Sequence, residues 1–463
     1  MVLPASSLYV SELLGLQTSG FYVPESMSIV VGGLSSPSLS QDHVLNGTFL
    51  HEYLHHLHFC ATTAGLAYHL SSLATTQALL ELASAFRERR RDALIPRSAD
   101  TLLAQAKGDR HLDKQVARYA FEVKYRNNML GWPCAPLMRR TCPPVGLILE
   151  DGSKRVLPVG LLLICENHAR LQQWRYLRVN VKDEAIIDNI DIRTFMPSEE
   201  TFIANYCRYL SIADGFVQNF GYDPQESETL FLWACAKALM PPPMLYPEDL
   251  DDAENAAANM ASATKIDPRF PGQRYFYVSR FLLNFSDRRF LLNLCQKGQF
   301  EELDALVSSA LGWAPIIQVV DQLEGQAEKP ASTLMRKIIR GAVACHRKYP
   351  DFLVWPVAHI FGLLNELPLV STILPDGSLR ISDWCSLPER YEIAHWSVSR
   401  ELAIALERPC PMRCYYSKCC AGYPANTWDR LGRRSDTGNC HLEINIQKHW
   451  GLSLRDFELA HSI

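Results

Sequence analysis

The chain has 463 residues, of which 48% are hydrophobic and 21% charged, and its formal net charge is −4. This is the composition of an ordinary globular protein long enough for two or three domains. It lacks the basic excess typical of nucleic-acid-binding chains, so we expect no nucleic-acid partner. Residues 1–20 contain no basic segment followed by an apolar one, which predicts no secretory signal and a cytoplasmic protein.

Helical periodicity dominates the chain, and strand patterns are few. We predict helices over 43–88 with a break at Gly65, 100–130, 160–178, 198–219, 225–240, 271–311, 331–348, 350–365 and 388–407. We predict strands over Ser28–Val31, in a hairpin across 145–159, and over Leu177–Val181 and Leu442–Ile446. The fold class expected from these elements is α+β and predominantly helical.

The clearest domain boundary is the Pro241–Pro243 run, which an acidic segment over 248–254 follows. It separates a first domain, 1–243, from a helical domain, 244–463. The uncharged stretch Tyr53–Leu80 is long enough to span a bilayer, but its four histidines and many hydroxyl residues predict burial inside the protein. We therefore expect no membrane association.

The string His51-Glu52-Tyr53-Leu54-His55 has the form H-E-x-x-H and lies inside the first predicted helix. Residues i and i+4 share one helix face, so His51 and His55 can direct two imidazole nitrogens at one zinc ion. Glu52 then lies near the open position, where it can take a proton from water. The alternative is an accidental string whose histidines bond backbone carbonyls in a core helix. We expect His56 and His58 to be core residues, or residues that surround the metal ligands without binding the metal.

A catalytic zinc site usually has three protein ligands and one open position. The H-E-x-x-H-x-x-G-x-x-H arrangement is excluded, because His58 and Ala61 stand at the required Gly and His positions. Glu166, a lone acid in the apolar run 159–169, is the first candidate for the third ligand. Its alternative role is an exposed helix acid paired with Arg170. Glu200 and Glu122 are the second and third candidates.

These features resemble zinc metallopeptidases of the zincin type, in a gluzincin-like layout with a distal Glu, over about residues 40–180; no named peptidase family is indicated. Arg170 departs from the thermolysin-like pattern, which has Asp there. The resemblance implies a zincin-like catalytic core in 1–243 that holds one Zn²⁺ through His51, His55 and Glu166. It also implies hydrolysis of peptide bonds in a restricted set of protein or peptide substrates, with Glu52 as general base. The candidates for the oxyanion stabiliser are His168, Tyr176 and Tyr222.

A different class stays open: a non-catalytic helical interaction or scaffold protein with a structural metal site. Its support is the helical second half and a cysteine-rich segment over 410–441. A second, structural zinc there would use Cys410, Cys414, Cys419 and Cys440, with Cys420 and His441 nearby. Unligated thiols and disulfides are the alternatives for this cluster, and the scattered cysteines are expected to be reduced. The sequence gives no indication of oligomeric state.

Overall fold

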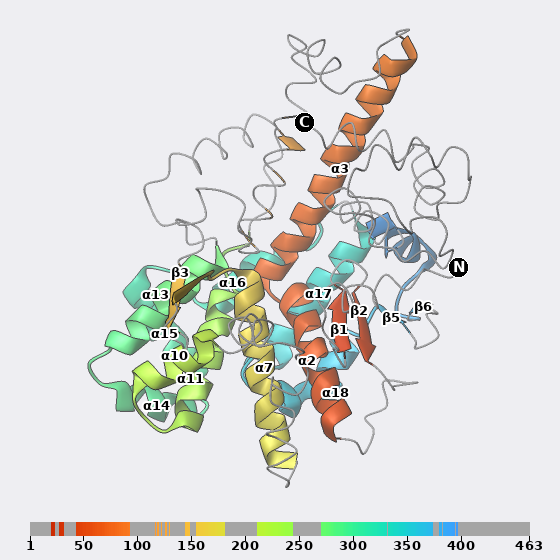
Figure 1. Ribbon diagram of the computed structural model, residues 1–463. Helices are drawn as coiled ribbons and strands as arrows, with labels where there is room; N and C mark the ends of the chain where they lie inside the picture. Colours follow the sequence, from red (N-terminus) through yellow and green to blue (C-terminus); the bar gives the residue numbers. More distant parts are fainter. Residues whose placement is uncertain are drawn as a thin grey trace.

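The structure is a computed structural model, and its described part is predominantly helical, as predicted (Figure 1). It describes residues 20–23, 27–31, 43–92, 116, 118, 119, 122, 126, 129, 144–148, 154–180, 211–243, 270–330, 332–373, 379–381, 383–393, 395 and 396. The predicted strand Leu442–Ile446, most of the predicted helices 100–130 and 198–219, and the cysteine-rich segment 410–441 lie outside these residues.

The helices of the described part are α2 His43–Cys60, α3 Thr63–Asp92, α7 Leu161–Asn180, α10 Ser211–Phe220, α11 Pro224–Ala238, α13 Pro271–Asn284, α14 Arg288–Gln296, α15 Phe300–Leu311, α16 Ile316–Glu324, α17 Thr333–Lys348 and α18 Pro356–Glu366. The single helix predicted over 271–311 is wrong, because it is divided into α13, α14 and α15. Asp287 caps the start of α14 through its side chain, and Gly298 turns the chain before α15 with φ +67°.

The strand predicted over Leu177–Val181 is also wrong, because Leu177–Asn180 forms the last turn of α7. Val179 carries the β-branched signal, but its side chain is 81% exposed and packs against little. Leu177 is 1% exposed and packs inward from the helix. Tertiary packing of α7 therefore overrides the local strand preference.

A four-stranded sheet joins distant parts of the chain in the order β1-β2-β5-β6. Its strands are β1 Gly20–Val23, β2 Ser28–Val31, β5 Ser371–Ile373 and β6 Leu379–Ile381. β2 pairs in parallel with β5, with Ser28 opposite Ser371, and the other two pairings are antiparallel. The predicted strand β2 is confirmed, whereas β1, β5 and β6 were not predicted.

The predicted hairpin is confirmed as β3 Pro144–Ile148 paired with β4 Lys154–Pro158, which places Val145 opposite Leu157. It leads into Val159 and Gly160, both buried, immediately before α7 begins at Leu161. The hairpin therefore comes directly before the helix that carries Glu166, and its position sets where that helix begins.

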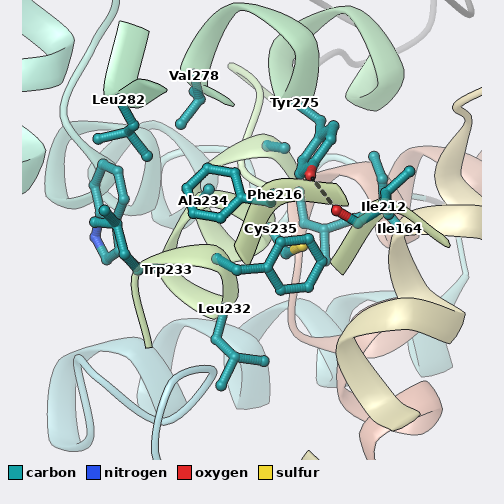
Figure 2. Packing of buried hydrophobic residues seen from close by; sticks show 14 of the residues in the cluster. Ile164, Ile212, Phe216, Leu232, Trp233, Ala234, Cys235, Tyr275, Val278 and Leu282 are labelled. Carbon is teal, nitrogen blue, oxygen red and sulfur yellow. Dashed lines mark hydrogen bonds between the residues drawn. The ribbon is translucent and has the colours of Figure 1, made fainter. Parts of the chain in front are cut away.

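Two clusters of buried apolar residues form the core. In the first, α11 packs among α7, α10 and α13, and Trp233 of α11 lies beside Leu282 of α13 (Figure 2). Tyr275 closes this cluster by donating its hydroxyl to the Ile212 carbonyl at 3.4 Å. The second cluster packs α2 against α16, α17 and α18. Both clusters combine residues from before and after Pro243, and the domain boundary at that position stays a prediction.

A buried ion pair holds the corner between α15 and α16. Lys237, fully buried, lies 2.5 Å from Asp304, which also accepts the backbone N–H of Ile316 at 2.5 Å. Burial lowers the pKa of Lys237, and the neighbouring Asp304 opposes that shift. Among the described helices, none alone has the length and apolarity to cross a membrane; α15 and α16 meet that test only as a pair bent by 89°.

The long helix predicted over 43–88 breaks at Ala61 and Thr62 rather than at Gly65. The Thr62 hydroxyl donates to the His58 carbonyl at 2.6 Å and accepts the Gly65 N–H at 3.1 Å, so it caps the start of α3. On the other side, His346 of α17 donates Nε2–H to the Ala61 carbonyl at 2.8 Å. These bonds satisfy two of the carbonyls and one of the N–H groups that the break leaves without intrahelical partners.

His346 gives the protein a pH-dependent stability. Burial lowers its pKa to about 4 from 6.5, although the bond to Ala61 favours the charged form. The pKa of His346 is lower in the folded than in the unfolded protein. Its contribution to the free energy of unfolding is therefore fully present above pH 6.5 and is lost as pH falls towards 4, at about 1.4 kcal/mol per pH unit. Urea unfolding at pH 7 and pH 5 should show a smaller pH effect in His346→Gln than in the unmodified chain. His43→Gln, at an exposed position, is the control; an identical pH effect in both variants would contradict this assignment.

Candidate metal centre

The candidate site lies where α2 and α7 pack side by side (Figure 1). A glycine permits this close approach, because a Cβ at Gly47 would lie 3.1 Å from Cδ2 of Leu177. α2 has no charged residue other than Glu52 and its histidines, so it can be buried on nearly all sides. Its His51 and His55 face the turn of α7 that carries Glu166.

The structure brings together the three residues predicted as ligands. His51 Nε2 and His55 Nε2 are 3.1 Å apart, and they lie 3.5 and 3.4 Å from Oε2 of Glu166. In a tetrahedral zinc site with bonds of about 2.0–2.1 Å, ligand atoms are separated by about 3.3–3.4 Å. The three atoms therefore have the spacing of one face of such a tetrahedron, and the residues present fit a zinc ion.

The site is shielded from solvent, and the described residues supply three ligands for the four positions of a tetrahedral zinc ion. His51 and His55 are each 8% exposed, and the Glu166 side chain is 13% exposed. Within the described residues, no fourth His, Cys, Asp or Glu joins this cluster, whose ligand atoms all lie within 4.8 Å of one another. Burial lowers the pKa of His51 to about 4, so its ring is neutral and can coordinate a metal.

Glu52 is buried beside the cluster, with 6% of its surface exposed. Its pKa is raised to about 8, mainly by burial and also by the charge of Glu166, although His55 and a hydrogen bond from the Tyr22 backbone N–H oppose this shift. Tyr22 belongs to β1, so the edge strand of the sheet contacts the general-base candidate. No local sequence pattern identifies Tyr22, because a backbone donor in a four-residue strand carries no side-chain signal.

The neighbouring histidines have other partners. His56 Nδ1 lies 3.2 Å from the Tyr22 hydroxyl, and His58 Nε2 lies 3.0 Å from Nδ1 of His168. His56 and His58 are 1% and 0% exposed, as expected for core residues. Neither belongs to the cluster of possible ligands in the described structure.

The competing acids and oxyanion candidates are placed differently. Glu122 is buried but is not a member of the cluster, and Glu200 lies outside the described residues. Arg170, the alternative partner for Glu166, donates to Gln173 at 2.8 Å. The oxyanion candidates also have other contacts: Tyr176 with His43, Tyr222 with Phe220, and His168 with the Leu353 carbonyl.

The described cysteines supply no ligand to this centre. Cys60, Cys165, Cys235, Cys295, Cys345 and Cys385 are free and buried. Burial raises the pKa of the Cys60 thiol to about 12, so it stays protonated. The predicted zinc site at Cys410, Cys414, Cys419 and Cys440 lies outside the described residues and stays a prediction.

No protein-family model matches the chain, and no curated protein or solved structure matches it.

Proposed function

We propose that this chain is a zinc-dependent peptidase with a zincin-like core, in which His51, His55 and Glu166 hold one Zn²⁺. The observation that carries the proposal is the spacing of 3.1, 3.4 and 3.5 Å between the three ligand atoms. This spacing is close to the tetrahedral edge of about 3.3–3.4 Å expected for zinc with N and O ligands.

The proposed chemistry depends on Glu52. Zinc bound at this site would supply Lewis acidity, which lowers the pKa of water and polarises the substrate carbonyl. The positive charge of a bound Zn²⁺ would lower the raised pKa of Glu52 and so favour its carboxylate. This carboxylate would take a proton from the attacking water at one of its oxygens and pass it to the nitrogen of the leaving amine. The Tyr22 N–H that donates to this carboxylate would hold it in place.

Three protein ligands favour catalysis over the alternative of a scaffold protein with a structural metal. A structural zinc is normally closed by four protein ligands, whereas a catalytic one keeps an open position. The described residues supply three. The assignment to peptide bonds rests on analogy with other H-E-x-x-H proteins, in which Glu acts as the general base. We further propose a cytoplasmic protein with a restricted set of protein substrates, because broad proteolysis would damage its own cell.

Metal analysis tests the proposed ligands. Replacing His51 and His55 together by alanine should remove about one zinc per chain, because two of the three ligands that a catalytic zinc needs are lost. The quantity to compare is the difference in zinc content between variant and unmodified protein, both purified without chelator. A second zinc at the cysteine cluster would cancel in this difference.

The control is the double replacement of His43 and His359, neither of which belongs to the cluster. It should retain all the zinc of the unmodified protein. Full zinc occupancy in the His51/His55 variant would refute the site. Glu166→Gln should also weaken zinc binding, whereas Glu122→Gln should leave it unchanged.

A further inference from the structure

Two fully buried histidines outside the proposed ligand set connect the helices that carry it. His58 lies three residues after His55 on α2, and His168 lies two residues after Glu166 on α7; both are 0% exposed. His58 Nε2 is 3.0 Å from His168 Nδ1, and His168 Nε2 is 2.8 Å from the Leu353 carbonyl. The His58 ring also meets the His55 ring edge to face, with centroids 5.7 Å apart.

The direction of these hydrogen bonds follows from their last acceptor. A carbonyl can only accept, so the hydrogen on His168 must be at Nε2. Between two imidazole nitrogens at hydrogen-bond distance one must donate and the other accept, and a neutral imidazole has one N–H and one acceptor nitrogen. Nδ1 of His168 is therefore an acceptor, and His58 must donate its Nε2–H to it. Rotating either ring by half a turn would break this chain of hydrogen bonds.

The Leu353 carbonyl, the last acceptor in this chain of hydrogen bonds, is held in place by further contacts. Gln172, one turn beyond His168 on α7, donates to the Val354 carbonyl at 2.9 Å and to the Leu353 carbonyl at 3.3 Å. Leu353 and Val354 are themselves 4% and 3% exposed. The segment that accepts from His168 is therefore held both by its own burial and by a second side chain of α7.

We propose that His58 and His168 are positioning residues, which set the placement of α2 against α7 and hence that of His55 against Glu166. This inference rests on the proposed function. Metal sites require ligand distances within about 0.2 Å of ideal values, and two apolar helix faces alone do not specify a helix position that closely. The directional hydrogen bond between the rings of His58 and His168 fixes the position of α2 relative to α7. The edge-to-face contact between the His58 and His55 rings then fixes the orientation of the His55 ring.

Two substitutions at His168 separate its two bonds. His168→Asn keeps an oxygen close to the position of Nδ1, so it can still accept from His58 but cannot reach Leu353. His168→Gln keeps a nitrogen close to the position of Nε2, so it can donate to Leu353 but loses the bond to His58. Zinc affinity, measured by competition with a chelator, should fall about 10- to 100-fold in His168→Gln, which is the usual effect of replacing a residue that orients a metal ligand. The loss of affinity should be smaller in His168→Asn.

The control for general destabilisation is His69→Gln, at another buried histidine, on α3 against Trp396. Urea unfolding of the metal-free proteins should show destabilisation in this control without a change in zinc affinity. Unchanged zinc affinity in a destabilised His168→Gln would overturn the inference and leave the proposed function standing. Failure of the unmodified chain to bind zinc would overturn both.

A measurement on the unmodified chain covers the case in which the variants do not fold. Nitrogen-15 spectra of histidine-labelled protein distinguish the two neutral tautomers. His58 and His168 should both carry hydrogen at Nε2, with the His168 Nδ1 signal shifted as a hydrogen-bond acceptor. Hydrogen at Nδ1 of either ring would contradict the proposed chain of bonds.

Discussion

Replacing Glu52 by glutamine should leave zinc binding intact and reduce peptide hydrolysis by about 10²–10⁴-fold, the usual contribution of a general base. The amide has nearly the same size as the carboxylate but cannot accept the proton of the attacking water. Zinc content and cleavage of a mixed peptide library, followed by mass spectrometry, are the two measurements. The buried position of Glu52, with 6% exposure, requires that the variant be checked for folding as well.

Glu122→Gln is the matched control, since Glu122 is also a buried acid but lies outside the ligand cluster. It should cleave the same peptides at an unchanged rate. Retained hydrolysis in Glu52→Gln would remove Glu52 from the mechanism. Loss of zinc in that variant would instead mean that Glu52 contributes to metal binding.

Replacing Gly65 by alanine should destabilise the protein by about 3 kcal/mol or more, at the upper end of the range for overpacking. A Cβ at this position would lie 2.1 Å from the His58 carbonyl oxygen and 2.4 Å from the Phe59 Cα. Both are backbone atoms of the last turns of α2, so the clash cannot be relieved by a side-chain rotation. α3 would have to move away from the helix that carries the proposed ligands.

Gly215→Ala is the control, because a Cβ in the middle of α10 would meet no heavy atom within 4 Å. There alanine should stabilise the helix by about 0.5–1 kcal/mol relative to glycine. Urea unfolding of the two variants beside the unmodified chain measures both effects. Equal stability of Gly65→Ala and the unmodified protein would mean that α2 and α3 do not approach as closely as described.

The features that sequence reasoning located correctly depend on neighbours along the chain. The spacing of His51 and His55 places both on one face of α2, and the lone acid in an apolar helix marked Glu166. The hairpin before α7 was recognisable from its turn residues. Each of these signals lies within about twenty residues, where helical and strand periodicity act.

The features that were missed depend on residues far away in the sequence. The end of α2 is at Cys60 because Ala61 accepts a hydrogen bond from His346 and because α3 must pass the His58 backbone at Gly65. β1 contacts Glu52 through a backbone N–H, and β5 is a strand because it pairs with β2. No local pattern encodes such pairings, so periodicity alone could not find them.

The partners that enclose α2 are synthesised long after α2 itself. The Tyr53 hydroxyl donates to the Leu367 carbonyl, 314 residues later, and the Ala61 carbonyl meets a histidine 285 residues later. At a translation rate of about 5–20 residues per second, α2 emerges from the ribosome roughly 15–60 seconds before its Leu367 contact can form. Throughout that interval the nascent helix bears its three proposed active-site residues without the enclosure that buries them in the finished protein.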